Sequence, residues 1–142
     1  MNTENVVTYE DFVTHEDFVS YEDAKIINKL GFDWDTDYMY LTFDNIIYRL
    51  VIDEVDGAAL DKIADKGSVY KCPTLAQAQK WLRKEKNHHV DSSCIDKDIW
   101  YYTISELIDN VVVLRNDLEF SSYEEALSAG ITECLKILGK NI

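Results

Sequence analysis

Aspartates at alternate positions form the most metal-like pattern in this sequence. Asp33, Asp35 and Asp37 could converge on Ca²⁺, as carboxylates do in the first half of an EF-hand loop. The rest of that loop is missing, because Tyr38 stands where the sharp turn needs glycine and Asp44 stands where a bidentate glutamate is needed. We therefore interpret the segment as a solvated turn that leads into a strand, and we expect no metal site.

The cysteines offer a second kind of chemistry, nucleophilic catalysis. Cys72, Cys94 and Cys134 are far apart and odd in number, so no Cys-x-x-Cys pair exists, and we expect free thiols. Cys72 lies two residues before the expected helix cap Thr74, where a helix dipole could lower the pKa of its thiol. No base or resolving thiol is identifiable, so an enzyme centred on Cys72 or on Asp33–Asp37 is the alternative rather than the leading interpretation.

Histidine and glycine patterns add no further site. His88 and His89 are adjacent, and neighbouring residues of a strand point to opposite faces, so both cannot easily bind one metal ion. The third histidine, His15, lies in an N-terminal repeat. The five glycines are all isolated, which excludes a glycine-rich phosphate loop. We therefore expect no catalytic, cofactor-binding or metal-binding residues.

A basic cluster interrupts the otherwise acidic chain. Lys80, Arg83, Lys84 and Lys86 crowd the end of an expected helix, where they could bind an anion or an acidic partner. Cations in the last turns of a helix also offset its dipole, and this explains most of their placement.

Hydroxyl residues mark the start of three expected helices. Ser20, Thr74 and Ser122 are each followed three residues later by an acid or an amide, as in a capping box. The helices are predicted at 21–30, 75–86 and 123–138, each with an apolar stripe. Gly31, Asn87 and Gly139 should terminate them, and Gly130 should mark a close approach to a neighbouring element.

Between the helices apolar residues recur at every second position, a spacing that is typical of strands. The expected strands are 38–43, 46–52, 88–94, 99–105 and 110–115, with turns at 44–45, 96–98 and 109–110. Residues 57–66 could form a short helix that ends at Gly67. Short turns between consecutive strands imply an α+β fold with a mostly antiparallel sheet of about five strands and three main helices packed on one face.

An acidic hexapeptide repeat occupies residues 7–24, in three copies of the type Val-Thr-Tyr-Glu-Asp-Phe. Its third copy runs into the first expected helix. We predict a loosely ordered acidic arm at 1–18 and a single α+β domain at 19–142, since 142 residues suit one core.

The formal net charge of −13 limits the possible partners. Such a charge repels nucleic acid and anionic membrane and favours a basic protein partner. The first 24 residues hold seven acids and no base. A signal peptide and an apolar run of about 20 residues are both missing, so we expect a cytoplasmic protein. The leading interpretation is a non-enzymatic acidic interaction protein, in one version a nucleic-acid mimic.

Two segments carry a resemblance to known sequences. These are Cys-Pro-Thr-Leu-Ala-Gln-Ala-Gln-Lys-Trp-Leu-Arg at 72–83 and Phe-Ser-Ser-Tyr-Glu-Glu-Ala at 120–126, with a His-Val strand start between them and Cys134-Leu135 downstream. Over roughly residues 19–138 the chain resembles small uncharacterised proteins of phage, prophage and Bacteroidales genomes. The doubled hexapeptide departs from their usual pattern. The resemblance implies a mobile-element or commensal origin and no particular reaction.

Overall fold

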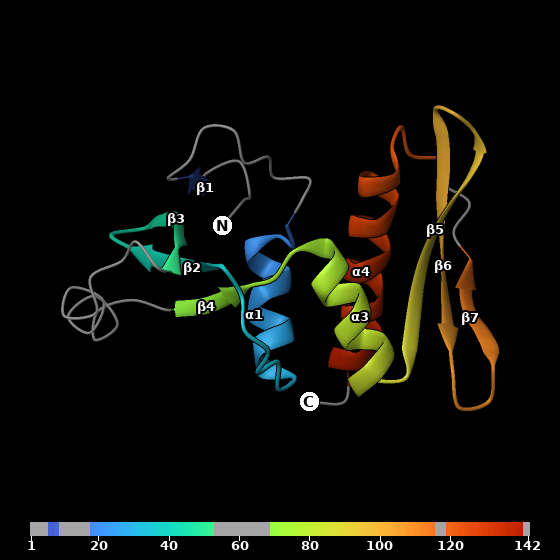
Figure 1. The fold of residues 1–142 in the computed structure, drawn as a ribbon, viewed down its shortest axis with the longest axis horizontal. Coiled ribbons are helices and arrows are strands. Elements are labelled where there is room, and N and C mark those ends of the chain that lie inside the picture. Colours follow the sequence, from blue (N-terminus) through green and yellow to red (C-terminus); the bar gives the residue numbers. More distant parts are fainter. Residues whose placement is uncertain (1–5, 9–17, 53–68, 116–118, 141–142) are drawn as a thin grey trace. The chain divides into compact units, whose positions relative to one another are not determined.

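The computed structural model describes residues 6–8, 18–52, 69–115 and 119–140 (Figure 1). The chain divides into two compact units, Met1–Thr74 and Leu75–Ile142, and each is described by itself. Both combine helices with antiparallel strands, which confirms the α+β class. The short helix expected at 57–66 lies outside the described residues. The arm at 1–18 and the single domain at 19–142 stay predictions.

The first unit contains a sheet of four strands in the order β1-β3-β2-β4. Its strands are β1 (Val6–Thr8), β2 (Tyr38–Phe43), β3 (Ile46–Val51) and β4 (Val69–Cys72). β1 runs parallel to β3, whereas β2 is antiparallel to both of its neighbours. The sheet therefore joins a local hairpin to two short strands from distant parts of the sequence.

The hairpin β2–β3 forms as its turn residues predict. Asp44 and Asn45 both adopt the left-handed conformation, with φ of 53° and 63°. A two-residue turn of this kind is type I′, whose twist matches that of the flanking strands, and Asn and Asp tolerate it well. The turn sets the register that pairs Phe43 with Ile46 and Tyr38 with Val51.

Helix α1 (Tyr21–Lys29) has the predicted caps at both ends. At its start, Ser20 Oγ accepts a hydrogen bond from the backbone N–H of Asp23 at 3.1 Å. At its end, Gly31 has a φ of 101° and donates its N–H to the carbonyl of Asn28, while Phe32 donates to Ile27. These two bonds form a Schellman motif, which satisfies carbonyls that the helix itself leaves free.

The second unit contains a sheet of three antiparallel strands in the order β5-β6-β7. Its elements are α3 (Leu75–Glu85), β5 (His88–Asp96), β6 (Ile99–Glu106), β7 (Val111–Arg115) and α4 (Tyr123–Gly139). Both helices cover the same face of this sheet (Figure 1). Left-handed Asn87 and Asn110 precede β5 and β7, as expected for a helix cap and a turn.

Gly130 lets α4 approach the sheet closely, as predicted. A Cβ at this position would lie 2.6 Å from Cγ1 of Val90 and 3.0 Å from Cβ and Cγ of Tyr102. Distances this short exclude any side chain at position 130 unless the sheet moves. Around this contact Val90, Ile104 and Ile131 are fully buried.

The capping box of α4 is shifted by one residue at its return bond. Ser122 Oγ accepts from the N–H of Glu125 at 3.1 Å, as predicted. The carboxylate of Glu125 reaches back to the N–H and hydroxyl of Ser121, at 3.1 and 2.7 Å. These bonds hold the pKa of Glu125 below its usual value. Glu125 thus fixes the residue before the cap.

Two expectations are wrong. The strands do not form one sheet of five with all helices on one face, because β1 and β4 complete a separate sheet in the first unit. Helix α4 ends at Gly139 as predicted, but Gly139 is not its cap either, since it is the last helical residue and Lys140 is the cap. No helix in the described ranges is both long and apolar enough to cross a bilayer.

Candidate functional site

The segment Asp33–Asp37 forms an ordered row of carboxylates in the first unit. The three aspartates are exposed, whereas Trp34 and Thr36 between them are half-buried. This alternation is typical of an extended segment, in which side chains two residues apart lie roughly 7 Å from each other. The carboxylates therefore point to solvent along one side of the segment.

Lys71 on β4 holds the backbone of this row in place. Its ammonium group donates to the carbonyl oxygens of Asp33 at 3.1 Å and Trp34 at 2.9 Å. At the other end the carbonyl of Asp37 accepts from the N–H of Ile52 at 2.9 Å. Lys71 thus stabilises the segment through its main-chain atoms.

Within the described ranges the structure gathers no group of three or more histidine, cysteine, aspartate or glutamate side chains that could hold a metal ion. Asp33, Asp35 and Asp37 therefore form an exposed row along the chain and are not gathered into a chelating loop. Such a row can attract cationic groups without desolvating them.

Cys72 lies in the interior of the first unit rather than at a reactive position. Burial raises the pKa of its thiol to about 12, although a hydrogen bond with Tyr40 and the nearby Arg49 guanidinium act in the opposite direction. The expected lowering of the pKa by a helix N-terminus is therefore outweighed by desolvation. A neutral, inaccessible thiol cannot serve as a nucleophile.

The surroundings of Cys72 are a buried polar cluster. The hydroxyl of Tyr40 donates to the carbonyl of Val19 at 2.6 Å, and burial raises the pKa of this phenol as well. The guanidinium of Arg49 lies 4.4 Å from the ring centroid of Phe18, a cation–π distance. These contacts tie the segment before α1 to strands β2 and β3, which is a structural role.

The histidines and the basic cluster lie in the second unit. His88 and His89 begin β5, opposite Glu106 and Ser105 of β6, and the Nδ1 atom of His88 lies 2.7 Å from the carbonyl oxygen of Lys86. Of the cluster, Lys80 and Lys84 are exposed while Arg83 and Lys86 are half-buried. The ammonium of Lys86 lies 5.5 Å from the ring centroid of Trp81, so this cation packs on the helix that it follows.

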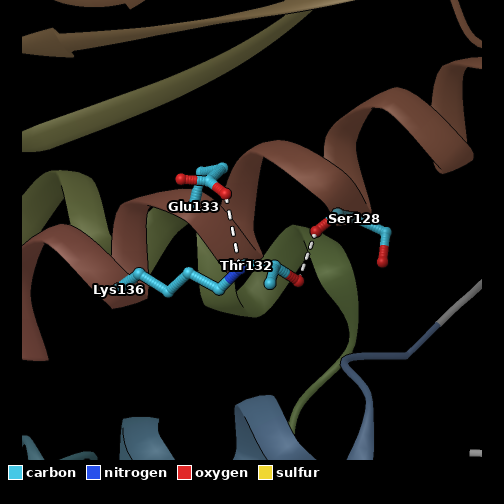
Figure 2. A network of polar contacts seen from close by, with 4 residues as sticks. All are labelled: Ser128, Thr132, Glu133 and Lys136. Atoms are coloured by element: carbon cyan, nitrogen blue, oxygen red, sulfur yellow. Dashed lines mark hydrogen bonds and ion pairs between the residues drawn. The ribbon is translucent and has the colours of Figure 1, made fainter. Parts of the chain in front are cut away.

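The polar contacts along α4 are also ordinary helix-surface contacts (Figure 2). Thr132 donates to the carbonyl of Ser128 at 3.1 Å, and Lys136 pairs with Glu133 at 3.4 Å. Both members of the ion pair are exposed, so water screens it strongly.

Two features of the structure were not predicted from the sequence. Arg49 is buried, and its only signal is that it is a lone cation in the apolar run Ile46–Val51. The end of the β6–β7 hairpin exposes a group of large apolar side chains from Leu107 to Val113. In the sequence this group is marked by three consecutive valines directly after the turn, which we interpreted only as part of a strand.

Comparison of the chain with models of protein families, with curated proteins and with solved structures finds no match in any of the three. The resemblance to phage and Bacteroidales proteins therefore stays a prediction, and the function has to be argued from the side chains themselves.

Proposed function

We propose that this chain is a non-enzymatic acidic interaction protein that binds a basic partner, and that Asp33–Asp37 is its point of contact. The net charge of −13 supports the choice of a basic partner, because long-range attraction accelerates the encounter of oppositely charged proteins. In its sharpest version the protein is a nucleic-acid mimic of mobile-element origin, which occupies a DNA- or RNA-binding protein.

The observation that carries the proposal is the anchoring of the carboxylate row by Lys71. A row whose backbone is already fixed loses little conformational entropy when a partner binds. Its carboxylates repeat at roughly 7 Å, which is about two base-pair steps along one strand of DNA. Lysine and arginine side chains that contact phosphates can reach such a row.

Cys72 gives the alternative, an enzyme, little support. The thiol is buried and neutral at physiological pH, and the described residues bring no base into an accessible site beside it. The acidic surface is therefore the better basis for a function.

The test compares two variants with the same change of charge. Asp33→Asn/Asp35→Asn/Asp37→Asn removes the row, and Asp91→Asn/Asp96→Asn/Asp98→Asn removes three exposed aspartates of the second unit. The probe is a fluorescent lysine- and arginine-rich peptide, titrated by anisotropy from low to physiological salt. We expect the first variant to weaken binding at least about tenfold more than the second, with steep salt dependence.

Equal loss in both variants would show that only the overall charge matters and would remove Asp33–Asp37 from the proposal. Binding that does not respond to salt, or no binding of the wild-type chain at low salt, would contradict the acidic-surface function itself. Competition by duplex DNA for a basic DNA-binding protein then tests the mimic version.

A further inference from the structure

The two sheets have four outer edges, on β1, β4, β5 and β7, and in the described residues side-chain bonds reach two of them. In the first unit, the side-chain amide of Asn28 bonds to the backbone of Lys71 on β4. In the second unit, Gln79 of α3 donates to the carbonyl of Val90 on β5 at 2.7 Å. Each contact occupies backbone groups that a strand of another molecule would need for pairing at that point.

The outer edge of β7 differs from those of β4 and β5. β7 pairs only with β6, and within the described part of the chain no strand or side chain bonds to its other edge. Natural proteins blunt such edges with lysine, proline or a bulge. β7 does have a bulge, since the register skips Val113, but the bulged residue is itself a valine. This edge strand carries apolar side chains at positions where edge strands usually carry a charged side chain that prevents pairing with another molecule.

The end of the β6–β7 hairpin exposes more apolar surface than any other described segment. Exposed fractions are 75% for Ile108, 53% for Val111, 59% for Val112 and 44% for Val113. The turn that presents them is ordered, because the carboxylate of Glu106 accepts from the N–H groups of Ile108 and Asp109 at 2.8 and 2.9 Å. Neighbouring apolar side chains on an ordered hairpin are typical of an interaction surface.

We propose that this surface, formed by Ile108, the β7 valines and the β7 edge, binds a second copy of the same chain. The strand is self-complementary in charge, because an acid (Asp109) precedes it and a base (Arg115) ends it. Antiparallel pairing of two copies brings the acidic end of each strand beside the basic end of the other and places valine against valine.

Electrostatics also favours this place for self-association. Two copies that each carry a charge of −13 repel one another over most of their surface. From Leu107 to Leu114 the chain carries only one charge, Asp109, so the repulsion is weakest where the valines are exposed. Added salt screens the remaining repulsion and should strengthen the dimer, the opposite of its effect on a basic partner.

Analytical ultracentrifugation tests the proposal with the full chain. We expect the mass to rise from that of the 16.4 kDa monomer toward twice this value as the concentration increases between about 1 µM and about 1 mM. Val112→Lys places a charge on the edge of both copies and should raise the dissociation constant at least about tenfold. Ile95→Lys is the matched control, since Ile95 is 70% exposed on β5 of the same sheet.

Circular dichroism and cooperative melting of both variants establish that each is folded. A wild-type chain that stays monomeric over the whole range would overturn the proposal, and so would equal weakening by Ile95→Lys or a dimer that dissociates as salt rises. Val112→Lys should leave binding of the basic peptide unchanged, so failure of this proposal is distinguishable from failure of the proposed function.

Discussion

The side-chain amide of Asn28 takes the place of a neighbouring strand beside Lys71. Its Oδ1 accepts from the backbone N–H of Lys71 at 3.3 Å, and its Nδ2 donates to the carbonyl of the same residue at 3.1 Å. Nδ2 also donates to the carbonyl of Ala24 at 2.7 Å. One residue of α1 thereby closes the edge of β4 and fixes the helix against the strand whose lysine anchors the aspartate row.

Replacement of Asn28 by alanine should lower the free energy of unfolding by about 1–3 kcal/mol, because it leaves the N–H and carbonyl of Lys71 without their partner. Urea denaturation measures the change through the transition midpoint. Lys29→Ala, at an exposed position of the same helix, is the control and should change stability by less than about 0.5 kcal/mol. Equal effects of the two substitutions would show that the amide does not stabilise the edge.

Gly130→Ala should destabilise the second unit despite the better helix propensity of alanine. Propensity contributes up to about 1 kcal/mol in favour of alanine, whereas forcing a methyl group into a well-packed contact costs about 1–3 kcal/mol. The added Cβ would meet Cγ1 of Val90 at 2.6 Å and Cβ of Tyr102 at 3.0 Å, and rotation of the Tyr102 side chain does not move its Cβ.

Thermal unfolding followed by circular dichroism tests this substitution, with Lys136→Ala on the exposed side of α4 as the control. The Lys136→Ala variant loses only a screened ion pair with Glu133, so the melting temperature of this variant should hardly differ from that of the wild type. An unchanged or raised melting temperature for Gly130→Ala would mean that α4 can move away from the sheet at little cost.

Local signals predicted most of the helices and hairpins because each is encoded by neighbouring residues. Asp44-Asn45 tolerates left-handed backbone, and Ser20 and Ser122 provide oxygens for free N–H groups at helix starts. The strands β1 and β4 were missed, because they are short and gain stability only by pairing with residues far away in the sequence. Strand pairing of this kind depends on tertiary packing, which no local pattern encodes.

The candidate site was predictable only in part. The alternation of aspartates at 33–37 indicated an exposed turn, but its anchor, Lys71, lies 38 residues from Asp33 in the sequence. The proximity of Cys72 to a helix start suggested a lowered pKa, yet the burial of the Cys72 side chain raises the pKa instead. Long-range contacts set both results.

Thiol labelling should distinguish the three cysteines. Cys94 is exposed, whereas Cys72 and Cys134 are buried, and burial raises the pKa of both buried thiols to about 12. At neutral pH iodoacetamide should therefore modify Cys94 within minutes and leave the other two unmodified until the chain is denatured. Mass spectrometry of proteolytic peptides assigns each site. Modification of Cys72 in the folded protein at the rate of Cys94 would contradict its buried position.

Alkaline pH should destabilise the fold through the same two thiols. Well below pH 9 both are neutral in the folded and unfolded states, so they do not make stability depend on pH. Between pH 9 and about 12 the unfolded chain loses these protons while the folded chain keeps them. The free energy of unfolding should then fall by about 1 kcal/mol per pH unit for each thiol.

Urea denaturation at a series of pH values above neutrality measures this slope. Cys134→Ala removes one of the titrating groups and should reduce the slope, even though the cavity it creates lowers stability at every pH. A slope unaffected by this substitution would assign the alkaline loss of stability to other groups, of which Tyr40 is the first candidate.

The dependence of the β4 edge on a single amide makes the first unit sensitive to chemical ageing. Hydrolysis of the Asn28 amide yields aspartate, whose negatively charged oxygen would face the carbonyls of Ala24 and Lys71 where an N–H group now donates to both. The hydrogen bonds from Asn28 to these two carbonyl oxygens would then be replaced by repulsion between the carboxylate and the carbonyl oxygens. This hydrolysis leaves the length of the chain unaltered and hardly changes its mass. In old preparations it would nevertheless loosen both α1 and β4.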